Sequence, residues 1–163
     1  MAIIVKLWEI MVNMFKGIHN INLDGKGRLT IPTKYRNTIT DQSNGSMVVT
    51  MDTEEKCLLL YPSTVWADIE KNINDLPSFS KNHRRIQRIL IGHAEDLEID
   101  SAGRILLSKP LRLAVEMTKK ITLIGQGAKF EIWSEDNWNA KVNRWRTEET
   151  DESEQSVLSD LRI

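Results

Sequence analysis

The sequence is poor in the residues that build disulfide scaffolds, metal centres and catalytic sites. Cys57 is the single cysteine, which excludes a disulfide framework within the chain and argues against a cysteine metal site. His19, His83 and His93 lie in different local settings, and none has a nucleophile or acidic partner at catalytic spacing. No phosphate-binding loop or paired-carboxylate motif occurs. We therefore expect no enzyme, and no metal, cofactor or small-molecule substrate.

Long apolar runs are also missing. Residues 1–13 are apolar but contain two charges, and they fall short of the about 20 residues that span a bilayer. They also lack the small-residue cleavage site of a signal peptide. The body looks as if it begins again at Met14, so we treat residues 1–13 as an N-terminal extension. These absences predict a cytoplasmic protein with no membrane partner.

A charge excess is absent overall but present in parts of the chain. The formal net charge is −1, yet residues 147–163 carry six carboxylates against Arg162, which leaves +4 on residues 1–146. Within residues 14–46, five cations face two aspartates. The sequence therefore combines a basic body, which is compatible with a nucleic-acid partner, and an acidic tail. Tails of this composition are usually solvated and mobile.

One motif occurs twice. The stretches "DGKGRLTIP" (Asp24–Pro32) and "DSAGRILLS" (Asp100–Ser108) both read Asp-x-x-Gly-Arg followed by a short apolar strand, 76 positions apart. Arg36 and Arg112 have the same spacing, and "LLLYPS" aligns with "FEIWSE" at a spacing of 72. Matches in the same order indicate an internal repeat. Two copies of roughly fifty residues would be marginal alone, so we expect them to pair as one pseudo-twofold unit.

The periodicity predicts an α+β, mostly β fold with flanking helices. The strands are expected over residues 20–23, 29–31, 47–51, 57–61, 97–99, 105–107, 121–124 and 130–133. The helices are expected over residues 34–39, with Thr33 as the cap, and over 63–73, 81–93, 108–117 and 135–146. The domain divisions that follow are 14–75 (first repeat and helix), 76–93 (linker and helix), 94–146 (second repeat and helix) and 147–163 (acidic tail).

The repeated turn has two interpretations. An aspartate there can accept backbone N–H groups and pair with the arginine of its own or of the partner repeat, so each copy can be a folding turn and nothing more. In the first copy, however, Lys26 and Arg28 lie two apart and can project from one face. Such a cationic fork meets phosphates and guanine edges. The second copy has Ala102 in place of Lys26, which predicts less DNA contact and more structure.

At these residues the sequence resembles a known family. "MFKGIHNINLDGKGRLTIPTKYR", "CLLLYP", "RRIQRILIGHAEDLEIDSAGRILLSKPLR" and "GQGAKFEIWSE" are similar to MraZ, a family of bacterial transcriptional regulators. The resemblance covers about residues 14–146. It implies two tandem AbrB-like, swapped-hairpin domains, assembly into ring-shaped homo-oligomers, and a nucleoid-associated protein. It also implies binding of double-stranded DNA at repeated boxes upstream of the protein's own division and cell-wall operon, usually as a repressor.

The resemblance also implies which residues act. DNA contact falls first on Arg28 and Lys26, then on Arg104, with weaker candidates at Lys16, Lys34 and Arg36. The residues expected to hold the loops in shape are Asp24, Gly25, Gly27, Asp100 and Gly103. No DNA contact is transferred to the arginines at 84, 85 and 88.

A protein-interaction module is the alternative. AbrB-like folds also serve as antitoxins whose tail folds on a partner, and the acidic tail contains Val157, Leu158 and Leu161. A DNA regulator should retard its own upstream fragments, less strongly as salt rises. An antitoxin-type module should instead capture a protein, and deletion of the tail should abolish that capture.

Overall fold

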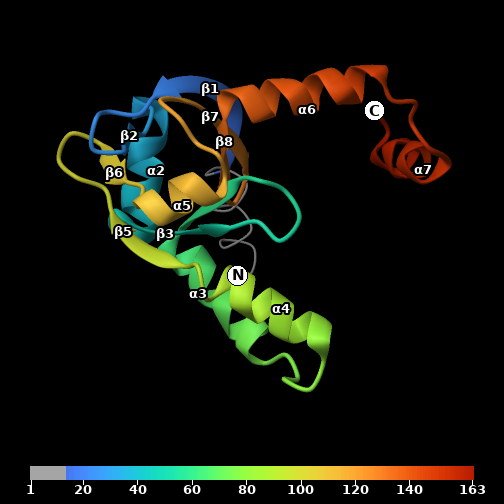
Figure 1. Cartoon of the computed structure of the whole chain (residues 1–163), viewed down its shortest axis with the longest axis horizontal. Coiled ribbons are helices and arrows are strands. Elements are labelled where there is room, and N and C mark those ends of the chain that lie inside the picture. The colour runs from blue at the N-terminus through green and yellow to red at the C-terminus, as the bar shows by residue number, and fades with distance from the viewer. Residues whose placement is uncertain (1–13) are drawn as a thin grey trace, which may run out of the picture.

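The protein is described here by a computed structural model covering residues 14–163 (Figure 1). The predicted N-terminal extension, residues 1–13, lies outside the described residues. The strands are β1 (Phe15–Asn22), β2 (Arg28–Thr30), β3 (Ser46–Met51), β4 (Leu58–Pro62), β5 (Glu95–Glu98), β6 (Arg104–Leu106), β7 (Lys120–Gly127) and β8 (Phe130–Ser134). The helices are α2 (Thr33–Ser43), α3 (Ser63–Asn74), α4 (Lys81–Leu90), α5 (Lys109–Ala114), α6 (Glu135–Thr147) and α7 (Glu152–Leu161).

The strands interleave the two repeats. A six-stranded antiparallel sheet has the order β1-β7-β8-β4-β3-β5, and β2 pairs with β6 in a separate two-stranded ribbon. The first strand of each repeat pairs with the other repeat, since β1 lies on β7 and β5 lies on β3. The order reads the same from either end once each strand is replaced by its counterpart. The α+β class is thus confirmed, with most strands in one antiparallel sheet.

The central strands are buried on both faces. Along β4, Leu58 and Leu60 point into one apolar cluster, while Leu59 and Tyr61 point into another. The first cluster includes Leu29 and Ile105 of the ribbon and residues of α2 and α5. The second cluster brings in α3, α4 and the start of α6. The ribbon and the pair α3–α4 therefore cover opposite faces of the sheet.

Several predicted boundaries move. Thr33 is the first residue of α2 rather than its cap, because Pro32 occupies the cap position without a side-chain hydrogen bond. The helix runs on to Ser43 and ends at Asn44, which adopts a left-handed conformation with φ 54°. Helix α4 ends at Leu90 and not at His93. Strand β1 starts earlier than predicted, at Phe15, since all eight of its residues pair with β7.

The acidic tail forms a helix that composition alone did not predict. Asp151 caps α7, with its carboxylate accepting the Glu154 N–H at 2.8 Å. Figure 1 shows α6 extending away from the sheet and α7 at its far end. Every residue of α7 is exposed. Among residues 14–163, no helix is long and apolar enough to cross a membrane.

Candidate nucleic-acid interface

The first loop, residues 24–28, is built around one carboxylate. Asp24 Oδ1 accepts the backbone N–H groups of Lys26 and Arg28, both at 2.9 Å. Asp24 Oδ2 lies 2.6 Å from Arg28 Nε, which donates to it. The backbone N–H of Gly27 closes the turn on the Asp24 carbonyl at 3.0 Å, with Gly27 at φ 84°. Only glycine adopts that conformation readily.

These contacts hold Asp24 in its charged form. The Arg28 backbone N–H and then the Arg28 guanidinium lower the pKa of Asp24 from 3.8 to about 2. Lys26 is exposed, and among residues 14–163 no side chain pairs with its ammonium group. The loop therefore presents one uncompensated cation beside an arginine that is already oriented.

The second loop, residues 100–104, repeats the geometry. Asp100 Oδ1 accepts the backbone N–H groups of Ala102 and Arg104 at 2.9 and 2.8 Å, and Arg104 Nε donates to Oδ2 at 2.9 Å. Gly103 has φ 78°. The Arg104 backbone N–H is the main cause that lowers the pKa of Asp100. As backbones, the two loops are equivalent.

Each loop is covered by an arginine from the other repeat. Arg112 on α5 donates from Nε to the Leu107 carbonyl at 3.0 Å and packs over Gly27, where a Cβ atom would come within 2.7 Å of Nε. Arg36 on α2 donates to the Ile31 carbonyl at 2.9 Å and covers Gly103 in the same manner. Arg36, predicted as a weaker DNA contact, thus lies against the second loop rather than its own.

The β2–β6 ribbon connects the two loops. The Gly27 carbonyl accepts the Leu107 N–H at 3.0 Å, and the Gly103 carbonyl accepts the Ile31 N–H at 2.8 Å. The three residues of β2 therefore separate the two loop glycines, a distance of about 13 Å over four Cα steps. Leu29 and Ile105 point inward and are buried, whereas the alternate residues of both strands are half-buried or exposed on the outer face. That outer face includes Arg28 and Arg104.

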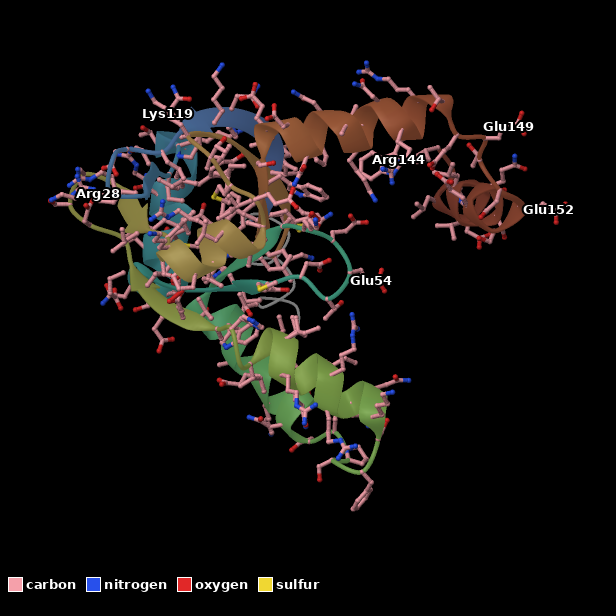
Figure 2. The ribbon with its side chains drawn as sticks, viewed as in Figure 1. Arg28, Glu54, Lys119, Arg144, Glu149 and Glu152 are labelled. Atoms are coloured by element: carbon pink, nitrogen blue, oxygen red, sulfur yellow. The ribbon has the colours of Figure 1, made fainter. Side chains whose placement is uncertain are left out.

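A cavity of about 410 Å³ adjoins the first loop. Its walls include Asp24 and Gly25 from the loop, and Arg112 and Lys119 from the second repeat. Figure 2 shows Arg28 and Lys119 at the same end of the molecule, opposite the acidic Glu149 and Glu152. The basic and acidic regions seen in the sequence are therefore also separated in space.

Lys16 and Lys34 form a second basic spot. Lys34 Nζ donates to the Lys16 carbonyl at 3.3 Å and lies 4.8 Å from the centre of the Tyr35 ring. The Tyr35 hydroxyl also donates to the Lys16 carbonyl and lies 2.9 Å from His19 Nε2. Burial, and then the Lys34 charge, lower the pKa of His19. Lys16 lies six positions before Asn22, the last residue of β1, a distance of about 20 Å along the strand.

The arginines of α4 lie on the other face of the sheet. Ile86 and Leu90 of this helix pack into the second apolar cluster, opposite the ribbon. Arg85 is bound to the Thr53 carbonyl at 2.9 Å, while Arg84 and Arg88 are exposed. Helix α4 therefore does not contribute to the surface formed by the two loops.

Sequence reasoning missed Arg112 and Lys119 at the first loop. The spacing of 76 marked Arg36 and Arg112 as equivalent residues. It did not show that each of these two side chains packs against the loop of the other repeat. Lys119 lies in "TKK", a stretch with no motif, and reaches the loop because Leu23 N–H donates to its carbonyl at 2.8 Å. Only the interleaved topology brings these residues together.

Comparison with known proteins gives a consistent result. The sequence model of the family described as "MraZ protein, putative antitoxin-like" matches twice, over residues 14–89 and 90–160. The chain is 50% identical over 136 residues to a protein of Legionella pneumophila (strain Corby) named "Transcriptional regulator MraZ", covering 83% of this chain and 90% of the relative. A protein of the same name from Marinomonas sp. (strain MWYL1) is 47% identical over 128 residues, covering 78% of this chain and 85% of the relative.

Proposed function

The chain belongs to the MraZ family of transcriptional regulators, and from that premise we propose that it binds double-stranded DNA through its first loop. Its targets are repeated boxes upstream of its own division and cell-wall operon, which it represses in the nucleoid. The two family matches, one per repeat, accord with the repeated turn seen in the sequence. No catalytic step is part of this proposal.

The orientation of Arg28 is the observation that carries the proposal. Its Nε is bound to Asp24 at 2.6 Å, which leaves both terminal nitrogens of the guanidinium for a partner outside the loop. Two parallel N–H donors match O6 and N7 of guanine in the major groove. Lys26, exposed two residues away, supplies a charge for a phosphate.

The ribbon supports a specific mode of approach to DNA. The major groove of B-DNA admits a two-stranded β-ribbon. Strands β2 and β6 form such a ribbon outside the main sheet, with Arg28 and Arg104 on its outer face. Both loops would then face one duplex, and the first loop would make most of the contacts.

The exchange of strands supports the swapped-hairpin interpretation. Because β1 completes the sheet of the second repeat and β5 that of the first, we assign the two repeats to the AbrB-like arrangement. We further propose that copies of the chain form a ring. A ring presents many first loops in a row, and linked sites gain avidity at repeated boxes without tight individual contacts.

A gel-retardation titration tests this function. The full chain should retard a duplex from the region upstream of its own gene, and retention should weaken as salt rises. A scrambled duplex of equal length is the control. Equal retention of both duplexes would remove the claim of sequence-specific regulation.

An antitoxin-like role is the second candidate, and it is favoured by one observation. On α7, Val157 and Leu161 are 58% and 62% exposed, so the tail carries apolar side chains that stay largely open to solvent in the described chain. The matched family is itself described as "antitoxin-like". If this role is correct, deletion of residues 148–163 abolishes capture of a protein partner and leaves DNA retention unchanged.

A further inference from the structure

We propose that the cavity beside the first loop is a phosphate site formed jointly by the two repeats. Arg112 and Lys119 of the second repeat hold one backbone phosphate of the DNA that Arg28 and Lys26 of the first repeat contact. This inference rests on the proposed DNA-binding function and adds a ligand position and two residues to it.

Arg112 is held in place through its Nε atom, and its two terminal nitrogens remain available as donors. Its Nε donates to the Leu107 carbonyl at 3.0 Å, and its guanidinium packs against Gly27. Among residues 14–163, no acceptor binds its two terminal nitrogens. A planar guanidinium with both terminal nitrogens available matches two oxygens of a phosphate.

Lys119 is anchored through its backbone and exposed at its side chain. Its carbonyl accepts the Leu23 N–H at 2.8 Å, which places the residue directly beside the start of the first loop. It lines the same cavity as Arg112 and Asp24. Within the described part of the chain, no carboxylate pairs with its ammonium group. The side chain is therefore available to an anion from outside.

The Asp24 carboxylate does not oppose an anion here. Two backbone N–H groups and Arg28 Nε already bind its oxygens, at 2.6 to 2.9 Å. The Arg28 guanidinium thereby compensates the negative charge of Asp24. The first-loop cluster still has a net charge of +3, from this one carboxylate and the four cations Lys26, Arg28, Arg112 and Lys119.

The second loop provides an internal comparison. Gly45 is the counterpart of Lys119, because its carbonyl accepts the Ile99 N–H at 3.0 Å just as Lys119 accepts that of Leu23. The second-loop cluster has a net charge of +1, from Asp100, Ala102, Arg104, Arg36 and Gly45. Next to Gly45, Ser46 Oγ donates to Glu98 at 2.5 Å, which adds a carboxylate where the first repeat has Asn22. The phosphate site is thus a property of the first loop only.

The test combines Lys119→Gln with duplexes that carry a neutral methylphosphonate at one phosphate at a time. We expect Lys119→Gln to weaken binding of the upstream duplex about 5-fold and to reduce the slope of log K against log salt by about 0.9. One methylphosphonate position should weaken wild-type binding by more than this factor, and it should weaken Lys119→Gln by less than it weakens the wild type, because only the Arg112 contact to that phosphate remains in the variant. Lys119→Arg should restore both affinity and slope.

Lys71→Gln is the matched control. Lys71 is an exposed lysine on α3, on the face of the sheet opposite the ribbon, and its removal should leave affinity and slope unchanged. Thermal melting of each variant separates a binding defect from a folding defect.

The outcomes separate the inference from the function beneath it. If Lys119→Gln binds with an unchanged slope while Arg28→Ala binds poorly, the phosphate site is refuted and DNA regulation stands. The site is equally refuted if the loss of affinity caused by Lys119→Gln and the loss caused by the methylphosphonate are fully additive at every position tested. If the wild-type chain binds no upstream duplex, both proposals fail.

Discussion

The first and second loops share a backbone and differ in their surroundings. In both, an aspartate binds two N–H groups and the arginine four residues on, and a glycine with positive φ lies under an arginine from the other repeat. The first-loop cluster carries +3 and the second +1. The comparison shows that the Asp-x-x-Gly-Arg motif builds the same turn in both repeats, and we propose that the cations around it determine which copy contacts DNA.

The strands that lead into the loops also differ in charge, and the strand before the first loop is again the more basic one. Strand β1 contains Lys16 and His19 and has no carboxylate, whereas β5 contains Glu95, Asp96 and Glu98. Coulomb repulsion from these carboxylates disfavours a phosphate near the second loop. The acidic α7 lies at the opposite end of the molecule from Arg28 (Figure 2).

Truncation of the arginines should give the largest difference in DNA affinity between the two loops. We expect Arg28→Ala to weaken DNA binding by about 1–3 kcal/mol, because it removes a contact to a base. Arg104→Ala should weaken DNA binding by less. The sequence predicts a larger structural role for the second copy, but both arginines bind their aspartates alike, so the two variants should lower the melting temperature equally. Affinity titrations and melts of both proteins check this, and equal affinity losses would remove the distinction.

Substitution of the loop glycines should destabilise the two copies to a similar extent. Gly27→Ala and Gly103→Ala each force a side chain into positive φ and against an arginine, at a cost of about 1–3 kcal/mol of folding stability. Urea unfolding measures both costs. A large loss at one glycine and none at the other would show that the loops are not structurally equivalent.

Transfer of the missing lysine should strengthen the weaker loop. Ala102 is exposed and occupies the place of Lys26, so Ala102→Lys adds a cation without disturbing the turn. We expect the substitution to tighten DNA binding about 2-fold to 5-fold at low salt, and less as salt rises. Ala102→Gln is the control of similar length. Equal effects from the two substitutions would exclude a charge contribution.

Titration of Asp24 should have the smallest effect on stability among these predictions. The pKa of Asp24 is about 2, against 3.8 for an ordinary aspartate. Its contribution to stability is therefore complete above pH 3.8 and is lost as the pH falls through about 2. Carboxyl NMR should record this pKa, and Arg28→Ala should raise it. An unchanged pKa in that variant would mean that Arg28 does not hold the loop.

Much of the first loop was predictable from sequence, and its neighbours were not. The spacing of Asp24, Gly27 and Arg28 predicted the turn, because its contacts are local, but it left open which repeat's arginine pairs with Asp24. Arg112 and Lys119 reach the loop only through strand exchange, which residue spacing does not encode. The predicted cap at Thr33 was wrong because the helix already begins at Thr33 and Pro32 occupies the cap position. Helix α7 was missed because its acidic composition resembles that of a disordered segment.

Cross-linking from matched positions tests the central claim most directly. Positions 26 and 102 are both exposed and occupy the same place in the two loops. A photo-reactive side chain introduced at one or the other, in the full chain bound to the upstream duplex, reports which loop meets DNA. Our account predicts strong cross-linking from position 26 and little from position 102. Equal yields from the two positions would contradict it.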